Sequence, residues 1–484
     1  MLLNTTNMLG PIMTVPRPHF ERVSGYDIAI IGAGVVGCAM ARRFSLDGAR
    51  VVLLEKAADV LDGASKGNSG ILHTGFDAPE GSLELSCMQA GYREYIEIRE
   101  RLGLPLLQTG ALVLAWDDAQ LAALPGLMDK ARANGVDDIE NLTRDEILRL
   151  EPNLSPSLMG GFRVPQEYVI DPWSAAHGYL LQAIENGTDL FCDTELLRGE
   201  RQHGRWKLET NRGAIDAQIV INTAGLYGDI VDERLLGRRL FHIKPRKGQF
   251  VVYDKTAFDL AQHILLPVPS KLTKGVVVCR TAYGNLLVGP TAEEQDARDV
   301  ATLDEAQLRG LMQRGEDIIP KLADEPVTAI YAGLRPASDQ PEYRIEALLE
   351  DAYVSVGGIR STGLTASLGI AQHVAGLVQG EFSPPEQIKW PQAPQICETG
   401  PRDWQRPGHD GILCHCELVT RREIEQALAG PIAAHSLAGL KRRTRVTMGR
   451  CQGFYCSGEL ARITKDRLTS PMLPPFMPSG GKDG

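Results

Sequence analysis

The chain has 484 residues, and roughly 150 residues per domain predicts about three domains. Hydrophobic residues make up 43% and charged residues 23%, which excludes a mainly disordered chain or a charge-rich coiled coil. Lys and Arg total 51 against 61 Asp and Glu, a net charge of -10 that argues against a nucleic-acid-binding protein.

The N-terminal residues 1–24 contain no charged region followed by an apolar one, so they do not resemble a secretory signal. We expect them to form a flexible tail. No apolar run is long enough to span a bilayer, and the nine cysteines are interpreted as thiols or metal ligands rather than disulfides. The expected location is the cytoplasm, with association at the inner face of the membrane left open.

The first ordered unit is an apolar strand at 26–31, a glycine turn, a helix over 38–47 and a second strand at 51–55. The turn carries Gly32, Gly34 and Gly37, and Glu55 ends the second strand. In this context the pattern predicts a dinucleotide site. The glycines permit a tight turn, a close approach to pyrophosphate and close helix packing, and Glu55 accepts from a ribose hydroxyl. A glycine turn without a ligand is the alternative, and the pattern alone does not separate FAD from NAD.

Further along the chain, residues 62–75 form a Gly/Ser-rich loop, and helical patterns cover 82–102 and 117–150, with a helix start at Thr143. Short strands are expected within 187–225, and antiparallel strands within 241–290 turn at Tyr283-Gly284-Asn285. A helix follows at 303–319, and residues 351–378 predict strand, glycine turn and helix. The Pro-rich stretch 383–408 is typical of a linker.

Four segments extend the dinucleotide signal: Ser65–Gly75, Thr194–Leu196, Thr223–Gly225 and Gly357–Thr365. With the fingerprint, they make residues 25–380 resemble FAD-dependent oxidoreductases of the D-amino-acid-oxidase type, in the branch of glycerol-3-phosphate dehydrogenases and L-2-hydroxyglutarate oxidases. The resemblance implies FAD as cofactor. It implies FAD contacts, besides the four fingerprint residues, at Lys56, Ser65, Asn68, Ser69, Leu196, Ala224, Gly225, Gly358, Arg360, Thr362, Gly363, Leu364 and Thr365.

The implied fold class is α/β. A discontinuous Rossmann-type FAD-binding domain is expected at 25–100, 165–240 and 340–382. An inserted α+β substrate domain is expected at 101–164 and 241–339. After the linker 383–408, a small [2Fe-2S]-binding module is expected at 409–475.

Three residues are candidates for the chemistry. Alcohol oxidation needs a base for the hydroxyl proton, and His73 lies in the loop that the resemblance places near the flavin. Arg335 and Lys274 resemble positions that hold the anionic substrate, where arginine offers a bidentate fork and lysine a point charge. The alternatives are a structural histidine and solvated surface cations. Lys247 is a weaker candidate for the anion.

The last part of the chain carries the cysteine pattern C-x-C and C-x₄-C, at Cys414, Cys416, Cys451 and Cys456. Two thiolate pairs can each hold one iron of a [2Fe-2S] cluster. The pattern and its surroundings resemble the bacterioferritin-associated-ferredoxin-like module. Zinc is the competing metal for these four cysteines. The basic run 441–445 offsets the charge of an anionic cluster or, equally, forms a solvated helix face.

The sequence thus predicts an FAD-dependent dehydrogenase of a small anionic secondary alcohol. Glycerol 3-phosphate or a polyol phosphate is the first choice of substrate, and a 2-hydroxy acid such as L-2-hydroxyglutarate the second. Hydride would pass to flavin N5 and electrons would leave singly through the cluster to an acceptor protein or a quinone-linked subunit. The alternatives are an amine or imino-acid dehydrogenase on the same fold, and a non-catalytic electron-transfer subunit.

Overall fold

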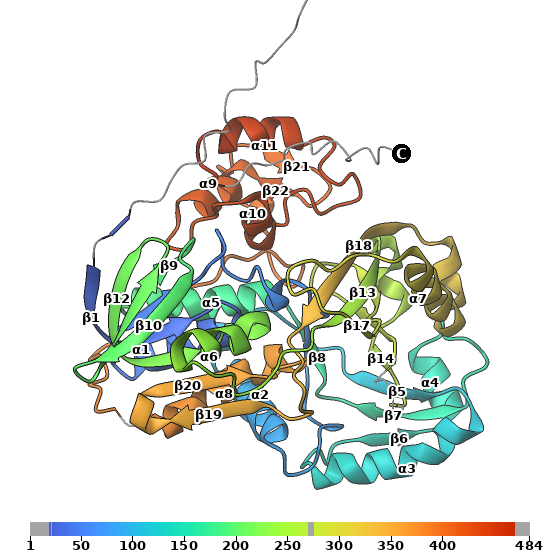
Figure 1. Ribbon diagram of the computed structural model, residues 1–484. Coiled ribbons are helices and arrows are strands. Elements are labelled where there is room, and N and C mark those ends of the chain that lie inside the picture. The colour runs from blue at the N-terminus through green and yellow to red at the C-terminus, as the bar shows by residue number, and fades with distance from the viewer. Residues whose placement is uncertain (1–18, 21, 270–274, 379, 470–484) are drawn as a thin grey trace, which may run out of the picture.

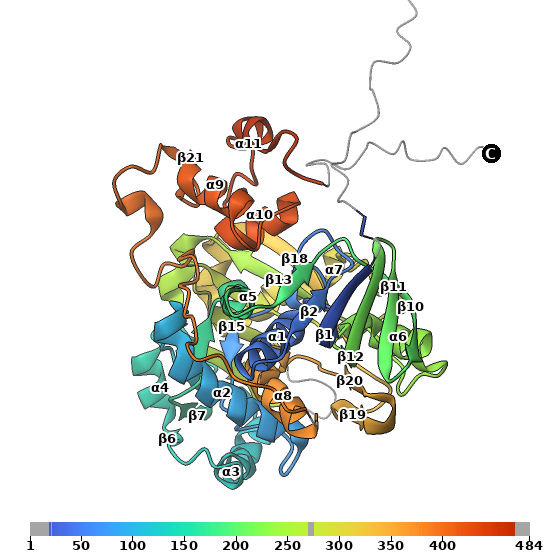
Figure 2. The ribbon, with the colours of Figure 1, turned by 90° about the vertical axis from the view of Figure 1, so that its left-hand side faces the viewer.

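The computed structural model describes residues 19–20, 22–269, 275–378 and 380–469 (Figure 1). Two large sheets lie side by side, and the C-terminal residues form a separate small module above them in both views (Figure 2). The predicted residue Lys274 lies outside the described residues. Among the described residues, no helix combines the length and the apolar character needed to cross a membrane.

The first sheet is built on five parallel strands in the order β9-β2-β1-β12-β20. The hairpin β10–β11 and the strand β19 add antiparallel partners at its edges. Strands β2 and β20 and the C-terminal ends of β1 (28–31) and β12 (220–222) are buried throughout, as in a parallel sheet covered on both faces. The strands are β1 (Arg22–Ile31), β2 (Val51–Leu54), β9 (Asp189–Phe191), β10 (Leu196–Gln202), β11 (Arg205–Thr210), β12 (Gly213–Asn222), β19 (Arg344–Leu348) and β20 (Tyr353–Gly357).

Helices α1 (Val35–Leu46), α2 (Leu83–Leu102), α5 (Pro172–Glu185), α6 (Gly228–Leu236) and α8 (Gly363–Leu377) pack around this sheet. Helices α2 and α8 approach closely because each presents a glycine to the other. A Cβ at Gly91 would lie 2.1 Å from the carbonyl oxygen of Thr365, and a Cβ at Gly369 would lie 2.1 Å from that of Cys87. This contact fixes the start of α8 against the body of the fold.

The second large sheet runs β17-β13-β16-β15-β14-β5-β7-β6, with β18 on the other edge of β13. Helices α3 (Asp118–Ala133), α4 (Arg144–Leu150) and α7 (Glu305–Ile318) lie against it. A three-stranded sheet of β3 (Ile71–Leu72), β8 (Tyr168–Ile170) and β4 (Leu106–Leu107) completes this part of the molecule. The strands of the second sheet are β5 (Ala111–Ala115), β6 (Glu140–Leu142), β7 (Gly160–Val164), β13 (Arg246–Tyr253), β14 (Ile264–Pro267), β15 (Val277–Arg280), β16 (Leu286–Gly289), β17 (Glu293–Glu294) and β18 (Val327–Arg335).

The C-terminal module contains β21 (Ile412–Cys414), β22 (Val419–Thr420), α9 (Arg421–Ala429), α10 (Leu437–Thr444) and α11 (Ser457–Thr464). It has its own apolar core, which includes Val419, Ile424, Leu440 and Leu460. The preceding Pro-rich segment is packed on the body: Ile396, Cys397 and Arg402 are buried within it.

The α/β fold class is confirmed, and most of the predicted elements are present. Two differ. Strand β1 begins at Arg22, so residues 22–24, expected in the tail, belong to a strand. The helical pattern over 117–150 is interrupted by β6, which pairs with β7, and a helix resumes at α4 behind a capping box of Thr143 and Glu146. The domain limits stay a prediction.

Candidate cofactor and active site

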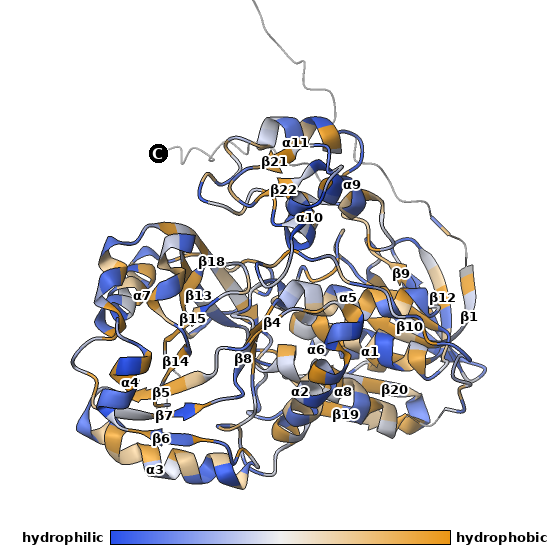
Figure 3. Cartoon of the chain, turned by 180° about the vertical axis from the view of Figure 1, so that it is seen from behind, coloured by the Kyte–Doolittle hydropathy of each residue, from blue (hydrophilic) through white to orange (hydrophobic). Residues whose placement is uncertain are grey.

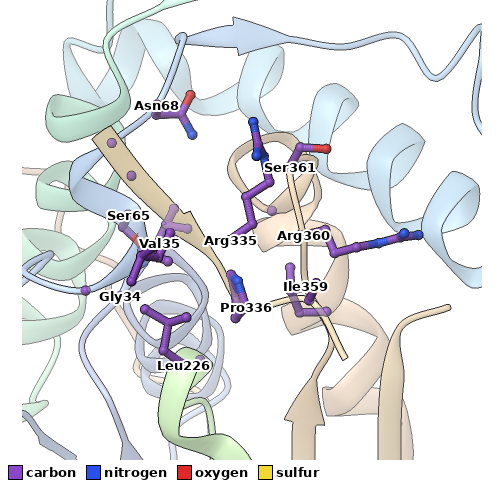
Figure 4. A pocket seen from close by; sticks show the side chains of 18 of the residues that line it. Gly34, Val35, Ser65, Asn68, Leu226, Arg335, Pro336, Ile359, Arg360 and Ser361 are labelled. Atoms are coloured by element: carbon purple, nitrogen blue, oxygen red, sulfur yellow. The ribbon is translucent and has the colours of Figure 1, made fainter. Parts of the chain in front are cut away.

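A cavity of about 1000 Å³ opens between the two large sheets (Figure 4). Its walls include the residues that directly follow four parallel strands: Gly32 after β1, Glu55 after β2, Thr223 after β12 and Gly358 after β20. Ligands of open α/β sheets bind at the carboxyl ends of the strands. Strands β13 and β18 of the second sheet supply the opposite wall. The topology therefore places one site between the sheets.

The glycine turn after β1 has no room for side chains. Gly32 has a φ of +103°, and a Cβ there would lie 2.8 Å from the carbonyl oxygen of Thr223. A Cβ at Gly37 would lie 1.9 Å from the carbonyl oxygen of Gly32. Gly37 itself lies behind the wall, where it lets α1 pack against the turn, while Gly32 and Gly34 face the cavity. The helix start can thus be approached closely by a ligand.

Side chains from neighbouring segments secure this turn. The Glu55 carboxylate accepts hydrogen bonds from the Ala33 N–H at 2.8 Å and the Ala57 N–H at 2.9 Å. Burial raises the pKa of Glu55, and these two backbone donors oppose the rise. Ser65 Oγ accepts from the Val35 N–H at 3.0 Å and so ties the loop at 62–75 to the start of α1.

His73, Arg335 and nearly all the predicted FAD-contact residues line this cavity. The exceptions are Gly37 and Thr365. Thr365 Oγ1 accepts the backbone N–H of His73 at 3.0 Å, so it supports the wall from behind. In Figure 4 Arg360 points away from Arg335. Its guanidinium donates to the Pro341 carbonyl and lies 4.0 Å from the Glu84 carboxylate.

Behind His73, outside the cavity lining, lies a residue that the sequence did not single out. His73 Nδ1 lies 3.0 Å from Glu167 Oε2, and the Glu167 side chain is fully buried. The other carboxylate oxygen accepts from the Thr74 N–H at 2.6 Å and from the Thr74 hydroxyl at 2.7 Å. A carboxylate only accepts hydrogen bonds, so Nδ1 carries the proton and Nε2 of the neutral ring is the free base.

The cation Arg335 ends β18 and faces the cavity (Figure 4). His73 lines the same cavity. Its guanidinium donates to the carbonyl oxygens of Lys247 and Thr291, each at 3.4 Å. Burial, and secondarily the nearby Arg246, lower the pKa of Arg335 to about 10, so the group stays charged at neutral pH. By contrast, Lys247 is buried and paired with Glu293 at 3.0 Å, and it does not line the cavity.

The loop and strand β18 touch directly. A Cβ at Gly67 would lie 3.0 Å from the Cα of Gly333, and the Tyr331 hydroxyl donates to the Asn68 carbonyl at 2.9 Å. The cavity wall that carries Ser65 and Asn68 is therefore held against the strand that carries Arg335.

The arginines of the basic run do not form the solvated helix face that was one of the two expectations. Arg442, Arg443 and Arg445 are buried. Arg443 pairs with Asp59 at 3.0 Å and Arg442 with Asp62 at 3.1 Å, both in the stretch between Glu55 and Ser65. Figure 3 shows α10 as a hydrophilic helix at the base of the module, facing the two sheets. Its cations therefore dock the module onto the main body instead of facing solvent.

A second contact joins the module to the body near its cysteines. Arg445 pairs with Glu417 at 2.9 Å, and its guanidinium lies 3.8 Å from the centre of the Tyr283 ring. Tyr283 in turn stacks on Trp173, with 5.5 Å between the ring centroids. Glu417 directly follows Cys416, so the cysteine region itself is anchored to the body.

The model of the family described as FAD dependent oxidoreductase matches residues 27–377. The chain belongs to this family. A second model, described as BFD-like [2Fe-2S] binding domain, matches residues 412–465 of the oxidoreductase. The expected recognition, the enzyme class and both cofactors are thereby confirmed, and zinc is set aside as the metal of the cysteine module.

Several known proteins are similar to this oxidoreductase. A glycerol 3-phosphate dehydrogenase of Caloramator mitchellensis is 31% identical, over 92% of this chain and 94% of the relative. One subunit of the anaerobic glycerol-3-phosphate dehydrogenase of Escherichia coli (strain K12) is 25% identical, over 90% and 87%. The structure of dithionite-reduced L-alpha-glycerophosphate oxidase from Mycoplasma pneumoniae with FAD bound has a TM-score of 0.71 and 27% identity, covering 77% of this chain and 99% of that chain.

The residues present fit FAD. The cavity is at the upper end of the roughly 300–1,000 Å³ of cofactor and small-molecule sites. The bare glycine turn suits a pyrophosphate, and the Glu55 carboxylate stands at the position of a ribose partner. The start of α8 at Gly363 also faces the cavity and offers the positive end of a helix dipole.

The cysteines also fit their cluster. The thiols of Cys416 and Cys451 contact one another, as do those of Cys414 and Cys456. Among the described residues no group of three or more His, Cys, Asp or Glu side chains could hold one metal ion. Each contact joins one cysteine of the C-x-C pair to one of the C-x₄-C pair, so the four thiols gather in one place, as the four ligands of a [2Fe-2S] centre must. Phe454 and Tyr455, between two of these cysteines, are 82% and 79% exposed.

Proposed function

We propose that this oxidoreductase is a dehydrogenase of a small anionic secondary alcohol, with glycerol 3-phosphate as the first candidate substrate. The observation that carries the proposal is that an oriented base and an anion-binding arginine line the same cavity. His73 is oriented by Glu167, and Arg335 faces the same space. The relatives named glycerol 3-phosphate dehydrogenase support this choice.

In this proposal each residue has one task. Arg335 binds the anionic end of the substrate through its planar fork of N–H donors. His73 Nε2 accepts the proton of the hydroxyl group that becomes a carbonyl. Glu167 keeps the proton of the imidazole ring on Nδ1 and stabilises the imidazolium that forms. FAD, when bound, supplies the acceptor for the carbon-bound hydrogen and its electron pair.

The C-terminal module supports a dehydrogenase over an oxidase. The solved Mycoplasma oxidase matches 77% of this chain over 99% of its own length. The Caloramator dehydrogenase aligns with 92% of this chain. The [2Fe-2S] cluster supplies a one-electron carrier. An acceptor outside the chain, either a protein or a quinone-linked subunit, is then part of the proposal.

A 2-hydroxy acid is the second candidate. An L-2-hydroxyglutarate dehydrogenase of Indibacter alkaliphilus is 28% identical, but over only 55% of this chain. Amine oxidation finds less support, because an amine that binds neutral needs no strong base, and the His73–Glu167 pair provides one. A glycine oxidase structure with 22% identity shows the shared fold alone.

The proposal is tested by anaerobic bleaching of the flavin in the purified holoenzyme. Glycerol 3-phosphate, polyol phosphates, L-2-hydroxyglutarate, lactate and proline are compared at equal concentration. We expect glycerol 3-phosphate or a polyol phosphate to bleach the flavin fastest and the cluster to become reduced during the same reaction. Bleaching by proline alone, or by no compound, would refute the proposal.

A further inference from the structure

Two arginines lie opposite each other on the cavity wall. In the antiparallel pair of β13 and β18, Arg246 lies directly opposite Arg335. Residues opposite each other in such a pair project from the same face of the sheet. Both arginines line the cavity, so that face is the cavity face.

The alternation along β13 agrees with this placement. Gly248, two residues after Arg246, also lines the cavity, and a Cβ there would lie 2.6 Å from the Arg335 guanidinium. Lys247, between them, points the other way to its ion pair with Glu293. Gly248 therefore leaves the space in which the Arg335 guanidinium sits beside Arg246.

Among the residues that the structure describes, no carboxylate is paired with either of these cations. Within the described part of the chain neither Arg246 nor Arg335 forms an ion pair within 4.0 Å, and the buried Nε of Arg246 has no hydrogen-bond partner. The other strand neighbour of Arg246 is Glu294, which is exposed and unpaired with it. Like charges directly opposite each other in a sheet are destabilising. An anion bound between the two guanidinium groups would offset this repulsion.

We propose that Arg246 and Arg335 together form a subsite for the dianionic phosphate group of the substrate, and that Arg246 sets the preference for phosphate over carboxylate. The inference rests on the proposed function. A phosphate monoester carries a charge of about −1.5 to −2 at pH 7 and presents three acceptor oxygens. Two guanidinium groups on one face match that charge and number of acceptors.

A carboxylate needs fewer positive charges and fewer hydrogen-bond donors than a phosphate. It carries one negative charge and two acceptor oxygens, which a single guanidinium fork satisfies. With Arg335 alone the subsite would suit a 2-hydroxy diacid. With Arg246 present, a carboxylate leaves one cation of the pair unneutralised, so the second arginine selects against it.

The test measures binding of inorganic phosphate to the oxidised holoenzyme, followed by the change in flavin absorbance. Arg246→Gln is compared with wild type and with Arg246→Lys, which keeps the charge. We expect Arg246→Gln to weaken phosphate binding about 10- to 100-fold, the equivalent of one lost charge-assisted hydrogen bond. Acetate binding should change much less, and Arg246→Lys should recover most of the phosphate affinity.

Flavin content and thermal unfolding of each variant report whether the fold is intact. The inference is overturned if wild-type protein does not bind phosphate, or if Arg246→Gln binds phosphate as tightly as wild type. It is also overturned if phosphate and acetate lose affinity equally. Because the readout is binding, it stands even if no alcohol bleaches the flavin, which would refute only the proposed function. In turn, bleaching by glycerol 3-phosphate in Arg246→Gln with an unchanged KM would refute the subsite alone.

Discussion

The exchange Glu167→Gln tests whether the buried carboxylate orients the base. Glutamine has nearly the same shape, and its amide oxygen can still accept the two donors of Thr74 that lie 2.6 and 2.7 Å from Oε1. The amide nitrogen then faces His73 Nδ1, which is 3.0 Å from Oε2 in the native protein. That nitrogen is a donor, so Nδ1 must become the acceptor and the ring proton moves to Nε2.

The magnitude follows from the role of Nε2. With the proton on Nε2, the imidazole cannot accept the proton of the substrate hydroxyl. General base catalysis contributes about 10²–10⁴-fold, and we expect the rate of flavin bleaching by substrate to fall within that range. The affinity for inorganic phosphate should be unchanged, because Arg246 and Arg335 on the cavity wall are untouched.

The assay is the anaerobic rate of flavin reduction in a stopped-flow instrument, at saturating substrate. The matched controls are His73→Ala and the double variant His73→Ala/Glu167→Gln. Since Glu167 acts through His73, the double variant should be no slower than His73→Ala. A wild-type rate for Glu167→Gln, or additive losses in the double variant, would refute the assignment of Glu167 as a positioning residue.

Three further exchanges test the cofactor sites and the docking of the module. Gly37→Ala should abolish FAD binding, because its Cβ would lie 1.9 Å from the Gly32 carbonyl oxygen. The control Gly126→Ala has no atom within 4 Å of its Cβ and should retain flavin absorbance. Cys451→Ser should lose iron and sulfide but keep its flavin, as measured by metal analysis and absorbance. Asp59→Asn leaves Arg443 buried without its carboxylate, so we expect a loss of about 3–5 kcal/mol in denaturant unfolding and faster proteolysis within 383–408.

Each of these has an outcome that would contradict it. Gly37→Ala purified with a full complement of FAD would show that the turn can open without cost. Iron and sulfide retained in Cys451→Ser would remove that thiol from the ligand set. If Asp59→Asn unfolds like wild type, the pair with Arg443 does not hold the module in place.

Local patterns explain why much of the fold could be predicted. The unit from Tyr26 to Glu55 is complete within one short stretch, because the strand, the glycine turn and the helix are neighbours in sequence. The structure places β1, α1 and β2 within a few residues of the expected limits. Likewise the spacings C-x-C and C-x₄-C can be read directly from the sequence. Such signals need no knowledge of the distant chain.

The rest of the site depends on contacts between distant residues. Glu167 lies in a segment with no distinctive spacing, and only the pairing of β3 with β8 brings it beside His73 and Thr74. Arg246 precedes Lys247, which the sequence favours over it as a candidate for an anion, and only the strand register shows which of the two faces the cavity. The residue types pointed to an anion site, but the sequence could not predict which side chain faces the cavity.

The position of α10 explains how the two cofactor sites belong to one protein. Asp59 and Asp62 follow Glu55 and precede Ser65, so both ends of this short stretch contact the cavity while its middle binds the module. Gly439 fits against Asp59 only because it has no side chain, since a Cβ would lie 2.1 Å from the carboxyl carbon. Buried arginine pairs are costly to break once formed. The segment that shapes the flavin cavity therefore also fixes the distance of the cluster module from it, as a one-electron relay between two cofactors requires.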